Sequence, residues 1–450
     1  MARGLKTLHQ RNILILTVVI VIALSSSVVV ASSSEASGGH STVLRNETTT
    51  KLTIEQAIAE VRLSNPGLAA VVARAEGLGH VIAQSNALPD AKLILNAMNL
   101  PVDSFSLKQE AMTQLQVGIS QQLPYPGKLA LRSEVAELIA GSAHYAAEEM
   151  RLKLVRDVKL LWWNIFYLDR ALDVTQQNQS LLRQLVEVAQ TKYKVGQGLQ
   201  QDVLLAQLEL SKLLDEDIKL IELRRVQVIR LNTLLDRPSQ ALIQLADADE
   251  SLPKLINEDE LLRMALKNRP ALMAAGVNVQ AAQVRKSLAN EDYKPDFTVS
   301  AIYGRRDGVN PNGNDRADFA SILLNMNLPL WTENKQDKLV DQRNSEWQQM
   351  RYHFADEENA IRETVSRYVA GYQRTVDQVK LYRTGIIPQA KQTVASMMSG
   401  YQVNKVDFLN LVRAQVTLFN YEKQYWLSLS QANQMLSQLV AAVSQEVIYE

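Results

Sequence analysis

The sequence predicts a mainly α-helical protein with a β-barrel part, in which each of two internal copies joins a hairpin of strands to a hairpin of long helices. Three observations lead to this fold class. Short motifs recur about 205 residues apart. Glycine and proline interrupt regular elements, and the chain contains only 18 and 12 of them. Together they make up about 7% of the 450 residues, whereas ~12% is usual. Finally, both copies contain a stretch in which apolar and polar residues alternate with period two.

The composition excludes several classes of protein. Forty-eight basic residues balance 48 acidic ones, so the chain lacks the net positive charge that favours nucleic-acid binding. The absence of cysteine removes disulfides, thiolate metal sites, cysteine nucleophiles and the acylated cysteine of a bacterial lipoprotein. A chain without cysteine suits an oxidising compartment.

The N-terminus has the features of a secretory signal. Three basic residues precede a charge-free apolar run, and small residues follow at the spacing of a signal-peptidase site (Arg3, Lys6 and Arg11; Ile13 to Leu24; Val29 and Ala31). We expect a signal peptide over residues 1–31 and a flexible N-terminal segment over residues 32–50, which is rich in Ser, Thr and Gly. The alternative is an uncleaved membrane anchor, because the apolar run can just reach spanning length.

The remaining chain contains a repeat. Matching residues occur in the same order, with separations that drift only from 204 to 208: Pro66 and Pro270, Asp90 and Asp296, Pro124 and Pro329, Tyr193 and Tyr401, Gln207 and Gln415. We therefore expect a first repeat over 51–236, a linker over 237–256 and a second repeat over 257–450.

Each repeat has the same predicted elements. Two short helices come first, the second of which begins at a proline. A β-hairpin follows, over 91–122 and 296–330, and then a long helical hairpin, over 129–236 and 335–447. Few prolines interrupt the long helices, although Pro388 beside Gly385 indicates a kink. The spacing of apolar residues along the second copy is typical of a coiled-coil seam.

The strands indicate a barrel shared between chains. Each has one apolar and one polar face, yet four strands are too few to close, since single-chain membrane barrels begin at about eight. Three chains would supply twelve strands, with Gln, Asn, Ser and Thr facing a wet lumen. The sequence therefore predicts a trimeric 12-stranded transmembrane β-barrel, with Tyr125, Tyr293 and Trp331 as membrane-interface aromatics. The alternative is a sandwich in a soluble protein.

The duplicated unit and the Tyr-x-Val-Gly reversal at Tyr193 to Gly196 resemble the TolC family of outer-membrane efflux proteins, over essentially all of Lys51 to Glu450. The segment Gln122 to Leu129 is similar to the junction of the family's heavy-metal branch, the partners of cation-exporting RND pumps. The resemblance implies a trimeric duct whose β-barrel continues into a long periplasmic α-barrel of antiparallel helices, docked through an adaptor onto an inner-membrane pump. Family members carry metals, drugs or polypeptides.

The resemblance also implies functional positions near the helix ends. The family's acidic pore-gate residues fall on Asn410 and Arg413, neither of which is acidic. Asp202 and Asp407 are candidates to supply the negative charge instead, although an aspartate in a first helical turn is also favoured by the helix dipole. Arg413 is a candidate to pair with a carboxylate in the closed state. The expected adaptor-contacting tips are Val195, Gly196, Gly198, Val403 and Asn404.

Catalytic and metal-binding patterns are missing from the sequence. The five histidines are scattered, and Met397 and Met398 are better interpreted as packing than as ligands. The acidic pairs at 148–149 and 357–358 are interpreted as solvated helix surface. There is no phosphate loop, nucleophile elbow or zinc-protease motif, so we expect no enzyme and no cofactor.

The expected function is the passive outer-membrane exit duct of a tripartite efflux system that exports metal cations. Its expected partners are two further copies in a homotrimer, a periplasmic adaptor protein, an inner-membrane RND pump and outer-membrane lipid, but no nucleic acid. Two alternatives stay open: a drug or polypeptide export duct of the same fold, and a periplasmic coiled-coil adaptor or tether.

Overall fold

The structure is a computed structural model that describes residues 51–449. The predicted signal peptide, 1–31, and the predicted flexible segment, 32–50, lie outside the described residues. Within the described part of the chain, no helix is both long and apolar enough to cross a membrane.

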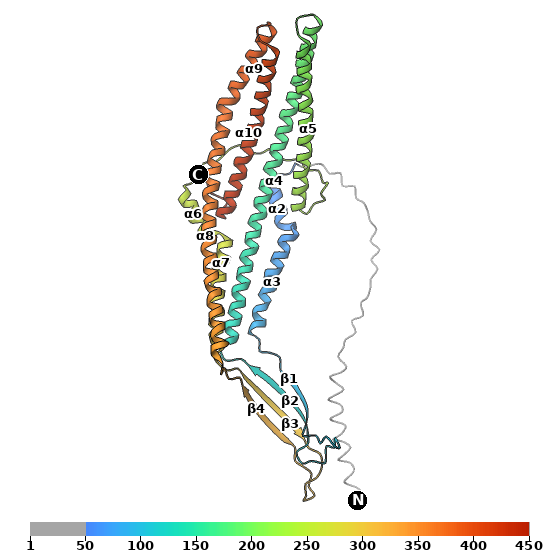
Figure 1. The fold of residues 1–450 in the computed structure, drawn as a ribbon, viewed down its shortest axis with the longest axis vertical. Coiled ribbons are helices and arrows are strands. Elements are labelled where there is room, and N and C mark those ends of the chain that lie inside the picture. The colour runs from blue at the N-terminus through green and yellow to red at the C-terminus, as the bar shows by residue number, and fades with distance from the viewer. Residues whose placement is uncertain (1–50, 450) are drawn as a thin grey trace. The chain divides into compact units, whose positions relative to one another are not determined.

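The first half of the described chain consists of two short helices, two strands and two long helices. In order, they are α2 (Ile54–Ser64), α3 (Pro66–Asn86), β1 (Lys92–Met98), β2 (Gln114–Leu123), α4 (Lys128–Lys194) and α5 (Gln200–Leu234). The two long helices run side by side and meet at a tight reversal at one end, whereas the strands lie at the other end (Figure 1).

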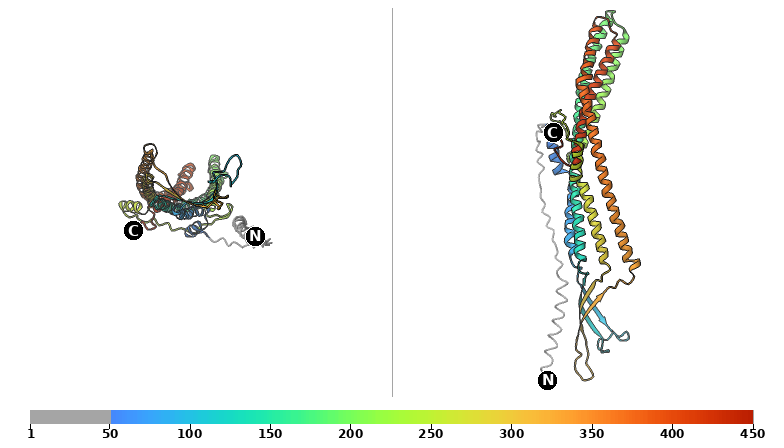
Figure 2. Two further views of the ribbon diagram at one scale, coloured as in Figure 1. Left: turned by 90° about the horizontal axis from the view of Figure 1, so that it is seen from below. Right: turned by 90° about the vertical axis from the view of Figure 1, so that its left-hand side faces the viewer.

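The second half has the same order of elements. Its outgoing helix, the one that leads from the strands to the reversal as α4 does in the first half, is divided into three pieces. The elements of this half are α6 (Glu258–Asn268), α7 (Pro270–Glu291), β3 (Phe297–Arg305), β4 (Phe319–Met326), the 3₁₀ turn η1 (Thr332–Asn334), α8 (Gln336–Leu381), the π-helical turn η2 (Tyr382–Ile386), α9 (Ile387–Gln402) and α10 (Phe408–Val443). A second view confirms that both helical reversals lie at the end away from the sheet (Figure 2).

The outgoing helical runs of the two halves are equally long. Helix α4 contains 67 residues, and the 46 residues of α8, 5 of η2 and 16 of α9 together number the same. The separation between matching residues rises from 205 at Pro124 and Pro329 to 208 at Tyr193 and Tyr401. The 3₁₀ turn η1, which has three residues and no counterpart in the first half, accounts for this increase.

Local sequence signals explain where the short helices begin. Thr53 caps α2 and shares a capping box with Gln56. Asn65 accepts a hydrogen bond from the backbone N–H of Leu68 and caps α3, whose first residue is Pro66. In the second half Asn257 caps α6 in the same way.

The four strands form one antiparallel sheet in the order β1-β2-β3-β4, so the two hairpins pair through their central strands. The prediction of a mainly helical chain with four antiparallel strands is therefore confirmed. Strands β1 and β4 lie at the two edges.

The two faces of this sheet differ in polarity. Residues paired across an antiparallel sheet share a face, and the register places a nearly continuous apolar set on one side: Leu93, Leu95, Ala97, Leu115, Val117, Ile119, Leu123, Phe297, Val299, Ala301, Tyr303, Ala320, Ile322, Leu324 and Met326. Most of these side chains are exposed, up to 83% for Ile322. The reverse face is mainly Asn, Gln, Ser and Thr, interrupted by Ile94, Met98, Ile302, Phe319 and Leu323.

Each half has its own hydrophobic core where the short helices pack on the long ones. Leu68, Leu154, Ile165 and Leu231 are central in the first, and the second gathers α6, α7, α8 and α10 around Leu261 and Val365 among others. The halves join because α4 packs against both α7 and α10.

The join between the halves corrects one expectation. Glu149 was expected on the solvated surface, but its side chain is 9% exposed and forms an ion pair of 2.6 Å with Arg269, the residue before α7. Arg269 also donates to the carbonyl of Ala441 at the end of α10. Glu149 faces inward because α7 and α10 of the second half cover that side of α4, an arrangement that helical spacing alone cannot reveal.

Candidate functional site

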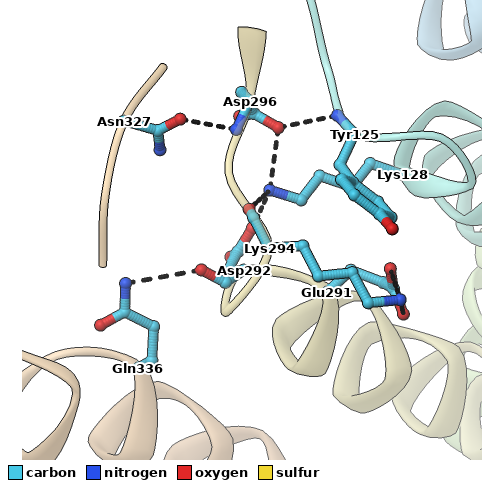
Figure 3. Close-up of polar contacts among 8 residues, drawn as sticks. All are labelled: Tyr125, Lys128, Glu291, Asp292, Lys294, Asp296, Asn327 and Gln336. Carbon is cyan, nitrogen blue, oxygen red and sulfur yellow. Dashed lines mark hydrogen bonds and ion pairs between the residues drawn. The ribbon is translucent and has the colours of Figure 1, made fainter. Parts of the chain in front are cut away.

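The junction between the sheet and the long helices is built around a buried lysine. Lys128 is the first residue of α4, and its side chain is 3% exposed. Its ammonium group lies 3.0 Å from Asp296 and 3.3 Å from Asp292 and donates to the carbonyl of Lys294 at 3.2 Å (Figure 3). The residue before it, Gly127, has φ +98°, which a residue with a side chain adopts with strain. The sharp turn therefore aims Lys128 of the first half into the loop of the second half.

Asp296 connects three segments at this junction. Its carboxylate accepts from the backbone N–H of Tyr125 at 2.9 Å, and its own N–H donates to the side chain of Asn327 at 2.6 Å. Burial by itself would raise the pKa of Asp296, but the hydrogen bonds from Tyr125 and Lys128 and the charge of Lys128 hold that pKa below its ordinary value. The segments at the ends of β2, β3 and β4 are thus held together by one residue, through its carboxylate and its backbone N–H.

The three predicted interface aromatics all lie in segments that connect strands to helices. The Tyr125 ring lies 4.9 Å from the Lys294 ammonium group. The hydroxyl of Tyr293 bonds to Asp337 in the first turn of α8. Trp331 is 79% exposed and precedes η1. Their roles at a membrane stay predictions.

At the opposite end, the two helical reversals lie at matching positions. Gly196 and Asn404, which are 208 residues apart, both have positive φ, +71° and +59°. Gly198 has no positive φ; a Cβ there would lie 3.0 Å from Lys192. Val195 and Val403 each remain 62% exposed, so both reversals present an apolar residue to the surroundings.

The reversals are tied together by a lysine that sequence patterns do not single out. The Lys192 ammonium group donates to the Tyr401 carbonyl and to the Asn404 side chain, each at 2.7 Å, and lies 4.2 Å from the centre of the Tyr401 ring. Tyr401 in turn packs against Phe408. A cluster of side chains from α4, α5, α9 and α10 surrounds these contacts.

The structure brings the two acidic gate candidates together. Asp202 lies in the first turn of α5, and Asp407 caps α10. Burial raises the pKa of Asp202, and the charge of Asp407 acts in the same direction, against the opposing effects of the Leu199 backbone and Lys192. Burial also raises the pKa of Tyr401, and both carboxylates add to that rise. A small acidic group therefore lies beside the reversals.

The other two gate candidates are not drawn into this group. Asn410 and Arg413 are exposed on α10, and neither has a side-chain ion pair or hydrogen bond within residues 51–449. No three His, Asp or Glu side chains in the described residues gather closely enough to hold a metal ion.

Comparisons with known proteins agree with this arrangement. Residues 261–445 match the family model described as outer membrane efflux protein. The chain is 22% identical over 396 residues to the cobalt-zinc-cadmium resistance protein CzcC of Cupriavidus metallidurans. This match covers 87% of this chain and 90% of that protein. It is also 22% identical over 238 residues to nodulation protein T of Rhizobium leguminosarum bv. trifolii, a match that covers 52% of this chain and only half, 50%, of that relative.

Solved structures have the same fold at low sequence identity. The outer membrane protein VceC of Vibrio cholerae superposes with a TM-score of 0.72 at 18% identity, over 87% of this chain and 96% of that one. CusC superposes with a TM-score of 0.73 at 14% identity, over 87% and 91%. Residues 261–445 thus match the family of outer membrane efflux proteins, and the chain shares the fold of these solved structures over 87% of its length.

Proposed function

We propose that this protein is the outer-membrane exit duct of a tripartite efflux system, which passively conducts metal cations from an inner-membrane RND pump and a periplasmic adaptor to the outside. The observation that carries the proposal is the sheet, whose exposed apolar face is backed by a mainly polar one. In water such a face is unfavourable by about 25 cal/mol per Å² of apolar surface, whereas against lipid it is stable, and the polar face can then line a lumen.

The same sheet supports a shared barrel. Strands β1 and β4 have no partner on their outer sides within the described chain, and unpaired backbone groups are costly in lipid. In the proposed homotrimer, β4 of one copy pairs with β1 of the next to close twelve strands. Tyr125, Tyr293 and Trp331 then lie at the membrane interface on the side of the long helices.

Helix α5 supports the trimer independently. Four of its apolar side chains are more than half exposed: Leu204, Leu208, Ile218 and Ile221. The residues 208 positions later, Val412, Val416, Trp426 and Leu429 on α10, pack inside this chain, where α10 lies against α4. If the two halves arose by duplication, the exposed face of α5 needs the equivalent partner, which is α8 and α9 of a neighbouring copy.

The long helices form the proposed periplasmic α-barrel, and their reversals form its inner end. We propose that the exposed residues there, Val195 and Val403 with their neighbours Gly196, Gly198 and Asn404, contact the adaptor. Asp202 and Asp407 are the proposed source of negative charge at the gate, since three copies of an acidic group around a pore concentrate cations. Asn410 and Arg413 would face the same opening, where Arg413 can pair with a carboxylate of another copy.

Metal cations are the cargo favoured by the relatives. CzcC is named for cobalt, zinc and cadmium resistance, and its similarity covers most of both chains. The match to nodulation protein T, which supports an export role with another cargo, is shorter and covers only about half of each chain. A periplasmic tether is disfavoured because it has no use for an exposed apolar sheet face.

The cargo is tested by the susceptibility of a deletion strain to divalent and monovalent metal salts and, in parallel, to amphiphilic drugs. Hypersensitivity confined to metals, restored by the intact gene, supports the proposal. Sensitivity to drugs and detergents without any change for metals would replace metal efflux with general export.

The assembly is tested by Ile218→Asp in the intact chain. The mass of the detergent-solubilised protein should fall from three copies to one, because a carboxylate cannot be buried unpaired in the proposed interface. The matched control is Leu63→Asp on α2, where Leu63 is 90% exposed and its counterpart in the second half is the lysine at 267. A trimer that withstands Ile218→Asp would contradict the proposed role of α5.

A further inference from the structure

A cavity of about 360 Å³ lies beside the π-helical turn, far along the chain from the strand–helix junction. Three elements enclose it: α4, the segment from η2 into α9, and α10. Its lining combines cations, carboxylates and aromatic rings: Arg170, Asp173, Val174, Gln177, Arg383, Ile387, Lys391, Glu422, Tyr425 and Trp426. Its size falls within the range of small-molecule sites, which are usually 300–1,000 Å³.

Among the side chains that line this cavity, the positive and negative charges do not cancel. Lys391 pairs with Glu422 at 3.2 Å. Arg170 pairs with Asp173 at 3.3 Å and also with Asp247, an exposed residue outside the lining, at 3.9 Å. Arg383, in the π turn itself, has no ion pair or hydrogen bond from its side chain within residues 51–449. Within the lining, three cations therefore face two carboxylates, both already engaged, and Arg383 is the lining cation that lacks a carboxylate partner among residues 51–449.

Arg170 also keeps an unused donor. Its Nε is buried and has no hydrogen-bond partner among the described residues, although its guanidinium carbon lies 5.5 Å from the centre of the Trp426 ring and 5.3 Å from that of Phe166. A buried donor left unpaired costs about 1–3 kcal/mol. A small rotation of the Arg170 side chain would offer this donor to an acceptor in the cavity, and the new hydrogen bond would recover the cost.

The remaining wall is aromatic and apolar. Trp426 packs edge-on against Tyr425, with ring centres 5.0 Å apart, and against Phe166 at 6.0 Å. Burial raises the pKa of Tyr425, Glu250 acts in the same direction, and Arg383 opposes them. The charge of Arg383 is thus felt at the aromatic wall, so the unpaired cation and the rings belong to one site.

A second cavity, of about 210 Å³ between α4, α5 and α10, provides a contrast. Its two lysines are each engaged by a carboxylate, Lys212 with Glu209 at 2.7 Å and Lys423 with Glu216 at 2.8 Å. That cavity offers no free charge to a ligand. The cavity at the π turn, by contrast, keeps the unpaired charge of Arg383.

We propose that the cavity beside the π turn binds an organic anion, a planar aromatic ring that carries a sulfonate or carboxylate group. The ring packs on Trp426 and Ile387, and the acid group accepts hydrogen bonds from Arg383 and from Nε of Arg170. Because π turns within helices occur frequently at functional sites, the place of Arg383 in such a turn supports this assignment. The proposal does not depend on the export function.

The test is a calorimetric titration of the full-length protein in detergent with naphthalene-2-sulfonate. Naphthalene-2-sulfonamide, neutral at pH 7, presents the ring without the charge, and sodium sulfate presents the charge without the ring. The sulfonate should bind once per chain and more tightly than either. If the sulfonamide bound as tightly as the sulfonate, binding would be partition into detergent or onto an apolar surface. If sulfate bound as tightly, the cavity would be a simple anion site. Either result would overturn the proposal.

Variants locate the site. Arg383→Gln should weaken binding of the sulfonate by about tenfold, the effect of losing one charged hydrogen bond, and high salt should reduce this difference. Arg374→Gln is the matched control, because Arg374 is exposed on α8 nine residues earlier, has no ion pair and does not line the cavity. Trp426→Leu should weaken binding of the sulfonate and should leave the binding of sulfate unchanged. Binding that Arg383→Gln leaves unchanged would place the anion elsewhere.

Discussion

The outgoing helices of the two halves begin at the same sheet and end at adjacent reversals, yet they are built differently. Helix α4 continues without interruption from Lys128 to Lys194. Its counterpart is interrupted by the π turn at Tyr382–Ile386, which contains Gly385 and is followed by Pro388 in the first turn of α9. A π turn widens the helix locally and leaves the i−4 pattern, so the second half tolerates a proline where the first half cannot.

The largest effect is expected when a proline is placed in the first half at the position that corresponds to Pro388. Ser180 is the residue 208 positions before Pro388 and is exposed on α4. Ser180→Pro should destabilise the chain by about 3 kcal/mol or more, since it removes a helical hydrogen bond and clashes with the preceding turn. Urea unfolding of the full chain in detergent, followed by circular dichroism, measures the loss.

Pro388→Ala serves as the control for that variant. It should change the free energy of unfolding by less than about 1 kcal/mol, because the π turn already accommodates the missing donor. Equal losses in the two variants would show that the halves do not differ in the way described.

The second test concerns the unequal junctions. The first half enters its long helix through Gly127 and the buried Lys128, whereas the second half enters through η1. Lys128→Met should cost about 2–3 kcal/mol, because it leaves Asp292 and Asp296 without their cation; the partial exposure of both carboxylates keeps the loss below that of a fully buried pair. The free energy of unfolding at pH 7 measures it.

Lys335→Met is the matched control, since Lys335 precedes α8 as Gly127 precedes α4 and is exposed without an ion pair in the described chain. Its effect should stay within about 0.5 kcal/mol. A loss as large as that of Lys128→Met would mean that both junctions need a cation equally.

The pH dependence of stability tests the same junction at a smaller scale. The folded chain lowers the pKa of Asp296, so its contribution is complete above the unfolded value of about 3.9 and is lost as the pH falls through the folded pKa. Thermal unfolding between pH 6 and about pH 2.5 should therefore show a steeper acid decline in the natural chain than in Asp296→Asn. Parallel declines would mean that this carboxylate contributes nothing to the junction.

The smallest effect is expected at the tie between the reversals. Lys192→Met removes the two hydrogen bonds to Tyr401 and Asn404, and about 1 kcal/mol of local stability should be lost. Hydrogen exchange of the Lys405 amide, which bonds to the carbonyl of Gly400, should accelerate about fivefold, while amides at the sheet stay unchanged. An unaltered rate at Lys405 would show that the tie does not order the second reversal.

Much of the fold could be predicted because its signals are local. Alternation in residues 297–303 fixes which side chains share a face, and Pro388 beside Gly385 indicates the interruption in the second outgoing helix. The charged contacts could not be predicted in this way. Lys128 meets Asp296 across 168 residues, and Arg269 meets Glu149 across 120, so neither pair leaves a periodic trace in the sequence. For the same reason, helical spacing alone misplaces Glu149 on the solvated surface.

The candidate functional residues likewise fall into those with a local sequence signal and those that depend on contacts between the halves. The reversals could be located because Gly196 and the matching Tyr-x-Val patterns are visible in the chain. Lys192, which ties them, could not be selected, because a lysine on a long helix is ordinarily a solvated side chain. Its role depends on the partner helix of the other half.

The equal lengths of the two outgoing runs limit how the protein can be resized. Seven residues are two helical turns and restore the same helix face. A heptad removed from both α4 and α5, the two arms of one hairpin, would draw that reversal back by about 10 Å and separate Lys192 from its acceptors. Removing the corresponding heptads from α8 and α10 as well would bring the reversals level again. Shortened or lengthened versions of this chain are therefore best designed with matched deletions or insertions in both arms of both hairpins.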